Sequence, residues 1–138
     1  MQITTNLKGI ENGRANFAYQ CVAEALEQGS ITNSEYKAYC KRIPMMIKTS
    51  GLANTIAFVK AKSTGGSSGA KSYDLLYRQL TIWLANSERS YLIQDFGEQE
   101  ELIERIVKLE SQAYRAVTVE VLSVFQWLRR LADGLLTN

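Results

Sequence analysis

Apolar residues recur every three or four positions along most of this chain, which is the spacing of one buried face of an α-helix. There is a single proline, and the alternation of apolar and polar residues that marks strands is rare. The helical stripes run through residues 14–28, 32–43, 52–62, 73–87 and 111–136. With 138 residues, 46% of them hydrophobic, the chain can bury one core. The pattern therefore predicts an all-α fold, a compact single-domain helical bundle of about five to six helices over residues 1–138.

The longest expected helix is C-terminal and runs from Ser111 to about Leu136. One apolar stripe along it alternates steps of four and three residues: Val117, Val121, Val124, Leu128, Leu131 and Leu135. A second stripe adds Leu122, Phe125, Ala132 and Leu136. So broad an apolar face indicates a helix at the centre of the bundle, or one that also docks a partner.

The stretch from Lys41 to Phe58 contains the clearest helix boundaries. Proline has no backbone N–H and disfavours the helical conformation of the residue before it, so we expect a boundary at Ile43 and Pro44. Gly51 can adopt the left-handed conformation that ends a short helix after Pro44. Leu52 then begins a new apolar stripe. Three helical pieces are expected to meet at these two corners.

The other boundaries are predicted from short polar segments. Residues 1–13 are mostly polar, so we expect a poorly ordered start before a first helix that begins at Arg14. Thr32 and Glu35 have the spacing of a capping box, which predicts the start of the second helix. Residues 63–70 are rich in glycine and serine and are expected to form a flexible surface loop within the domain. Ser72 is expected to cap the next helix.

Three side chains that could bind a metal, react or stack on a base lie on apolar stripes. Cys21 and Cys40 have no metal-binding spacing and are expected to be buried free thiols. Trp83 lies among leucines at helical spacing, so we expect it in the core instead of stacked on a base.

The residue inventory excludes most enzyme chemistry. The chain has no histidine, which rules out Ser-His-Asp and Cys-His catalysis and the common zinc sites. The glycines of residues 65–69 lack the G-K-[ST] ending of a phosphate-binding loop. We therefore expect no catalytic residue, no metal, no cofactor and no small-molecule substrate. No apolar run approaches the about 18 residues of a membrane span, and residues 1–13 do not resemble a signal peptide, so a cytoplasmic protein without a membrane partner is expected.

Charge is distributed unevenly, although the formal net charge is only +2. Seven basic residues and no acid lie between Glu35 and Asp74. Residues 1–78 carry ten basic and five acidic residues, net +5, whereas residues 79–138 carry six basic and nine acidic residues, net −3. Such polarity favours a polyanionic partner on the basic side. A solvated lysine-rich face without a partner would have the same composition.

Four separated motifs resemble those of a known family. The first three read K-R-x-P-x-M-I-x-x-x-G-L-x-x-x-x-A-F from Lys41, R-A-x-x-A-Y from Arg14 and L-L-Y-x-x-L-x-x-W-L from Leu75. The fourth is C-terminal and reads Y-R-A-V-x-x-E-V-L from Tyr114 and W-L-R-R-L-A from Trp127. Together they resemble the small all-helical subunit of the Cmr complex, the type III-B CRISPR RNA-targeting assembly. The resemblance extends from about Arg14 to Leu136. One departure is Ser50, where many relatives have asparagine.

The resemblance implies a non-catalytic scaffold subunit in antiviral defence. Its implied partners are the guide-RNA-bound backbone subunits, neighbouring copies of the chain in a minor filament, and target single-stranded RNA. The residues implied to contact RNA phosphates without reading sequence are Arg14, Lys41, Arg42, Lys48, Arg129 and Arg130. Arg129 and Arg130 have a second explanation, because cations near a helix C-terminus also stabilise the helix dipole.

Two other functions remain as alternatives. Residues 45–61 resemble a helix-turn-helix DNA regulator, with Gly51 in the turn and Asn54 and Thr55 opening a recognition helix. Against this, the expected recognition helix leaves little polar surface for a DNA groove. An enzyme would need a metal or cofactor that the sequence does not supply.

Overall fold

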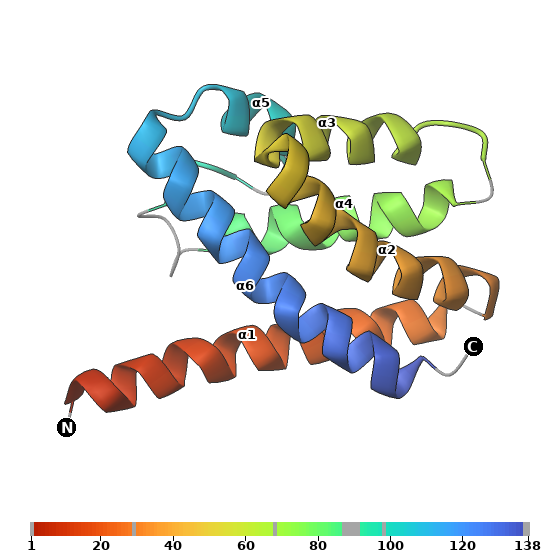
Figure 1. The fold of residues 1–138 in the computed structure, drawn as a ribbon, viewed down its shortest axis with the longest axis horizontal. Helices are drawn as coiled ribbons and strands as arrows, with labels where there is room; N and C mark the ends of the chain where they lie inside the picture. The colour runs from red at the N-terminus through yellow and green to blue at the C-terminus, as the bar shows by residue number, and fades with distance from the viewer. Residues whose placement is uncertain (1, 29, 68, 87–91, 98, 137–138) are drawn as a thin grey trace.

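The computed structural model describes residues 2–28, 30–67, 69–86, 92–97 and 99–136, and these form six α-helices and no strand (Figure 1). The helices are α1 (Gln2–Glu27), α2 (Ser30–Ser50), α3 (Leu52–Ser63), α4 (Ala70–Ala85), α5 (Leu102–Val107) and α6 (Ser111–Leu135). The predicted all-α bundle with a long C-terminal helix is confirmed.

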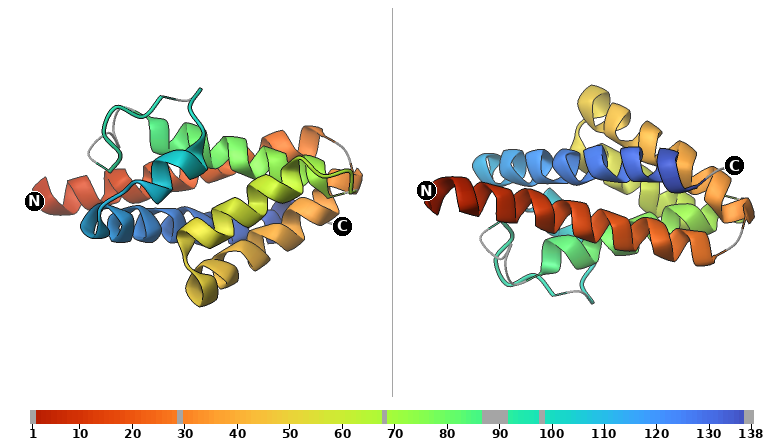
Figure 2. Two further views of the ribbon diagram at one scale, coloured as in Figure 1. Left: turned by 90° about the horizontal axis from the view of Figure 1, so that it is seen from above. Right: turned by 90° about the horizontal axis from the view of Figure 1, so that it is seen from below.

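The helices pack around α6 and α4 (Figures 1 and 2). Helix α6 lies against α1 on one side and α2 on the other, while α4 packs against α1, α2 and α3. Helix α5 packs against α3. The core between them contains Tyr36, Leu76, Leu80, Trp83 and Phe125, each at most 4% exposed. The core position predicted for Trp83 is therefore confirmed.

Both apolar stripes of α6 face the core for most of their length. Val117, Val121, Val124, Leu128, Phe125, Ala132 and Leu136 are buried. Leu122 and Leu131 are partly buried, and Leu135 is 40% exposed, so the first stripe leaves the core before the helix ends. Three of the four residues of the second stripe therefore face the core, and docking of a partner by α6 stays a prediction.

Helix α1 begins twelve residues earlier than expected, at Gln2 instead of Arg14. The missed signal is Ile3, Leu7 and Ile10, which continue the apolar spacing of the later residues toward the N-terminus. At the other end Leu26, which belongs to the apolar stripe expected over residues 14–28, is 51% exposed instead of buried.

The helix boundary expected at Pro44 is wrong, because α2 runs through this proline to Ser50. Proline removes one helical hydrogen bond, but Ile43 and Ile47 on either side are 0% and 3% exposed. Their burial on one face holds the helix together across the proline. The second corner is confirmed: Gly51 has φ +87°, and its N–H donates to the carbonyl of Ile47 at 2.9 Å.

The remaining elements differ from expectation mainly at their ends. Helix α2 begins at Ser30, before the expected capping box, and the side chain of Thr32 lies outside the described residues. Helix α4 begins at Ala70, with Gly69 at its N-cap, so Ser72 lies inside its first turn. The predicted Gly/Ser loop does connect α3 and α4, while its flexibility stays a prediction.

Two further expectations concern the thiols and membranes. Cys21 and Cys40 are free and buried, as predicted. Desolvation raises the pKa of each thiol well above its usual value, so neither is a reactive thiolate. In the part of the chain that the structure describes, no helix combines the length and the apolar character needed to cross a bilayer.

Candidate nucleic-acid interface

Helix α2 presents three of the expected RNA-contacting residues to solvent: Lys41, Arg42 and Lys48. Lys41 pairs with Asp133 of α6, with Nζ 3.1 Å from Oδ1. Arg42 donates from Nη1 to the Tyr73 hydroxyl at 3.2 Å, and its guanidinium lies 5.5 Å from the centre of the Tyr39 ring. These contacts orient Arg42 and leave it exposed, an arrangement suited to binding an anion.

Two contacts fix how α2 lies along α6. The Lys41–Asp133 pair joins the helices near the C-terminal end of α6. Near its other end, the Tyr114 hydroxyl accepts from the backbone N–H of Ala53 at 2.8 Å, just beyond the Gly51 corner. The helices therefore run side by side in opposite directions, as Figure 1 shows.

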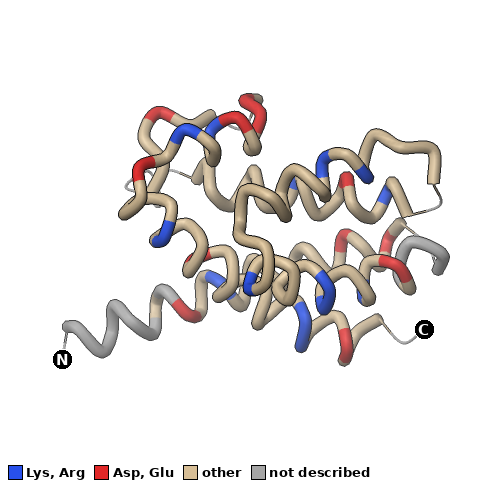
Figure 3. Tube along the Cα trace, turned by 45° about the horizontal axis from the view of Figure 1, so that its top comes forward, with Lys and Arg blue, Asp and Glu red and all other residues tan. Residues whose placement is uncertain are grey.

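This register brings the cations of two helices onto one surface. Arg129 lies one turn before Asp133 on α6 and so shares the side that faces Lys41, while Arg130 lies about 100° further round. Both arginines are exposed. We call the set Lys41, Arg42, Lys48, Arg129 and Arg130 the α2–α6 basic face. Figure 3 shows basic segments of α2 and α6 near each other, and acidic segments more frequent around α5.

The ion pair on this face would not prevent it from binding an anion. The side chains of Lys41 and Asp133 are 46% and 43% exposed. Exposed pairs of this kind stabilise a protein by at most about 1 kcal/mol and are screened by salt. A phosphate can therefore compete with Asp133 for Lys41.

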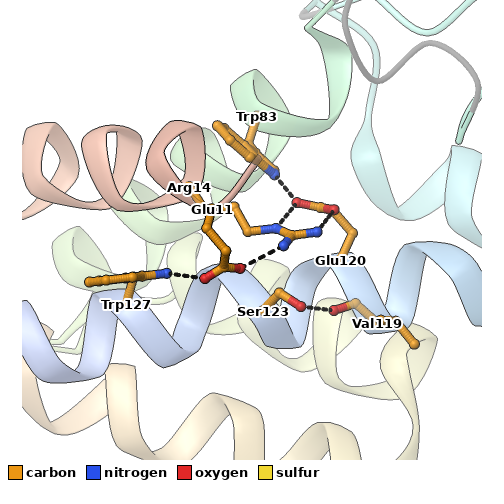
Figure 4. A network of polar contacts seen from close by, with 7 residues as sticks. All are labelled: Glu11, Arg14, Trp83, Val119, Glu120, Ser123 and Trp127. Carbon is orange, nitrogen blue, oxygen red and sulfur yellow. Dashed lines mark hydrogen bonds and ion pairs between the residues drawn. The ribbon is translucent and has the colours of Figure 1, made fainter. Parts of the chain in front are cut away.

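Arg14 occupies a different environment from the other five (Figure 4). Its Nε and Nη2 donate to the two carboxylate oxygens of Glu120 at 3.1 and 2.8 Å, and its Nη1 donates to Glu11 at 2.8 Å. The Arg14 side chain is only 17% exposed, and that of Glu120 only 6%. The hydrogen bonds with Glu120 raise the pKa of Arg14 above its usual value, although burial opposes this. Arg14 is thus a structural residue that joins α1 to α6.

Two tryptophans extend the same network. Trp83 of α4 donates from Nε1 to Glu120 at 2.8 Å, and Trp127 of α6 donates to Glu11 at 3.1 Å (Figure 4). Glu120 therefore links three helices. Sequence analysis missed it, although an acid between Val117 and Val121 on a core stripe is itself a signal that a buried cation must lie nearby.

The geometry of α3 argues against the helix-turn-helix alternative. Thr55, proposed to open a recognition helix, is fully buried, and its hydroxyl donates to the carbonyl of Gly51 at 2.8 Å. Leu52, Ile56 and Val59 are buried as well. Asn54 is exposed, but most of the expected recognition surface forms the inside of the bundle.

One hollow of the described region lies away from the basic face. It has a volume of about 750 Å³ and lies between residues 92–95 and 105–113. Arg105 and Lys108 line it together with Asp95 and Glu110, so its charges are mixed. The α2–α6 basic face is accordingly the stronger candidate for a polyanion.

Comparison with known proteins gives a consistent result. The model of one protein family, described as CRISPR-associated protein (Cas_Cmr5), matches residues 10–135. The X-ray crystal structure of a CRISPR-associated Cmr5 family protein from Thermus thermophilus is similar to this chain, with 26% sequence identity and a TM-score of 0.69. The alignment covers 91% of this chain and 98% of that chain. No curated protein matched the sequence.

Proposed function

Since the chain belongs to the Cas_Cmr5 family of CRISPR-associated proteins, we propose that it is a non-catalytic subunit of a type III-B (Cmr) effector complex and contacts the backbone of target RNA. In this role it packs beside the guide-RNA-bound backbone subunits and stacks with copies of itself in a minor filament. The complex as a whole would serve antiviral defence.

The observation that supports RNA contact is the α2–α6 basic face. Five exposed cations from two helices lie at or within about two turns of the Lys41–Asp133 pair that joins those helices: Lys41, Arg42, Lys48, Arg129 and Arg130. Phosphate contacts of this kind give affinity without base readout. That agrees with a complex in which pairing with the guide supplies the specificity.

The test is the salt dependence of binding to single-stranded RNA. If about four phosphates are neutralised, the logarithm of the affinity should fall with the logarithm of salt concentration at a slope of about −3. Fluorescence anisotropy with a labelled RNA measures this slope. A slope near zero would refute the phosphate contacts.

A pair of matched charge reversals locates the contacts. Lys41→Glu with Arg42→Glu should abolish binding, whereas Arg78→Glu with Lys108→Glu, which changes the net charge equally at exposed positions on α4 and after α5, should weaken it far less. Urea unfolding of both variants checks that the fold survives. Equal loss in both variants would mean that net charge alone, and not this face, governs binding.

Membership of the complex is tested separately. A tagged pull-down from the native host, with mass spectrometry and RNA sequencing, should recover further subunits and short guide RNAs. Recovery of the protein alone, or with duplex DNA, would contradict the proposed assembly.

A further inference from the structure

One apolar side chain lies exposed in the middle of the α2–α6 basic face. Met45 is 66% exposed, the largest fraction for any large hydrophobic residue whose side chain is described. Val119 and Val107 follow at 62% and 61%; Val107 is the last residue of α5, and Val119 lies ten residues before Arg129 on α6. An exposed methionine costs no stability by itself, but its position among cations calls for an explanation.

Met45 is surrounded by charge on its own helix. Residues three and four positions away are its neighbours on a helical surface, and they are Lys41, Arg42, Lys48 and Thr49. Thr49 donates its hydroxyl to the backbone carbonyls of Met45 and Met46, at 3.1 and 3.3 Å, so the other three neighbours on the helix are all cations. The register of α2 along α6 adds Arg129 from the other helix. Met45 lies one turn after Lys41 and Arg129 one turn before Asp133, and because the helices are antiparallel both lie in the same direction from the Lys41–Asp133 pair.

This arrangement is unsuited to the centre of a protein interface. Such centres are depleted of charged residues and of lysine in particular, because burying an unpaired cation is costly. A ligand that meets this face must offer negative charge to at least three cations and an apolar surface to Met45 between them. Single-stranded nucleic acid has both, since its phosphates are charged and the faces of its unpaired bases are apolar.

We propose that Met45 packs against an unpaired base of single-stranded RNA while Lys41, Arg42 and Lys48 hold the flanking phosphates, so that this face prefers single strands to duplexes. The inference rests on the proposed RNA contact and adds a non-electrostatic element to it. The thioether is flexible and polarisable and makes favourable contacts with aromatic rings. Every base has such a face, so the contact does not depend on sequence.

The test compares three RNAs by fluorescence anisotropy: a single-stranded oligonucleotide, the same strand with consecutive abasic positions, and its duplex. Met45→Ala should raise the dissociation constant for the single strand about three- to tenfold. The loss should vanish on the abasic strand and on the duplex. The salt slope should not change, because no charge is removed.

Two further variants control for generic effects. Met45→Leu keeps an apolar side chain and should stay within about twofold of the unmodified protein. Val119→Ala removes a similarly exposed apolar side chain that lies on α6 roughly 20 Å along the helix from Asp133, and it should have no effect. Loss of affinity for Val119→Ala equal to that of Met45→Ala would overturn the proposal.

Failure of this proposal can be told apart from failure of the proposed function. If the unmodified protein binds RNA with the expected salt slope but Met45→Ala binds it equally well, the base contact is refuted. The exposure of Met45 would then point to contact with a protein partner. Equal losses on the intact and abasic strands would also refute it. If the unmodified protein shows no salt-dependent RNA binding, both proposals fall.

Discussion

Replacing Arg14 by methionine tests whether this residue serves the fold or the RNA. The substitution removes two of the hydrogen bonds that the Glu120 carboxylate accepts, at 3.1 and 2.8 Å, together with the charge that balances it. The bond from Trp83 at 2.8 Å remains. Glu120 is only 5% exposed, so water cannot easily replace what is lost.

The expected loss of unfolding free energy is large for a residue near the protein surface. Removing one partner of a buried ion pair costs roughly 3–5 kcal/mol. Because the Arg14 side chain is still 17% exposed and part of its interaction is screened, we expect about 2–4 kcal/mol of lost unfolding free energy. The melting temperature should then fall by roughly 5–15 °C.

Urea unfolding followed by tryptophan fluorescence is a suitable assay, since Trp83 and Trp127 both donate to carboxylates of this network. Arg129→Met is the matched control and should change stability by no more than about 0.5 kcal/mol, because Arg129 is exposed. In RNA binding the roles reverse: Arg129→Met should make the salt slope shallower, and Arg14→Met should not.

A double variant separates the charge from the contacts. Glu120→Gln keeps a carbonyl that can accept from Trp83 but carries no charge, so Arg14→Met with Glu120→Gln should be more stable than Arg14→Met alone by about 1 kcal/mol or more. The reasoning is refuted if Arg14→Met costs less than about 1 kcal/mol and also reduces the salt slope. Arg14 would then belong to the RNA interface after all.

Three other outcomes follow from the structure. Gly51→Ala should lower the unfolding free energy by about 1–3 kcal/mol in urea titrations, because φ +87° is strained for any residue with a Cβ. Gly69→Ala should lower the melting temperature, because the new Cβ would lie 2.0 Å from the Tyr39 hydroxyl; adding Tyr39→Phe should restore part of the loss, since the next ring atom is 3.1 Å away. Alkaline pH should destabilise the fold. Burial raises the pKa of Cys21 and Cys40 above the usual 9.0, so in the unfolded chain these thiols lose their protons at a lower pH than in the folded protein. The stability that the two protonated thiols contribute is therefore complete below about pH 9 and is lost as the pH rises. The unfolding free energy should fall above about pH 9 by up to about 1.4 kcal/mol per pH unit for each thiol, and less steeply in Cys40→Ala.

Features with a strong local signal could be predicted from the sequence. The last helix begins at Ser111 as expected, because its apolar period is unbroken over the whole span. Gly51 was predicted to leave the helix because only glycine easily adopts its conformation. Pro44 shows the limit of such local rules, since the burial of Ile43 and Ile47 outweighs the hydrogen bond that the proline removes.

The candidate site was harder to predict, because a cation in a sequence does not reveal its partner. Arg14 and Lys41 both appear as basic residues within family-like motifs. The structure pairs Arg14 with a buried acid 106 positions away, whereas Lys41 meets an exposed acid that a phosphate can displace. Which arginine is structural is therefore decided by tertiary contacts that no local pattern records.

The same helix supplies both the internal acid and the external cations, and its geometry explains how. Positions 117, 120, 121, 124 and 128 of α6 face inward, and Arg129 and Arg130 follow within one further turn on the outer surface. Glu120 fixes α1 and α4 from the inside, while Asp133 fixes α2 from the side that carries Arg129. The spacing of cations on the α2–α6 basic face thus depends on the contacts that α6 makes with α1, α4 and α2. Cations spread over two helices can contact a phosphate backbone at several points, and phosphate contacts carry no base readout, which supports a role in which the guide alone selects the target.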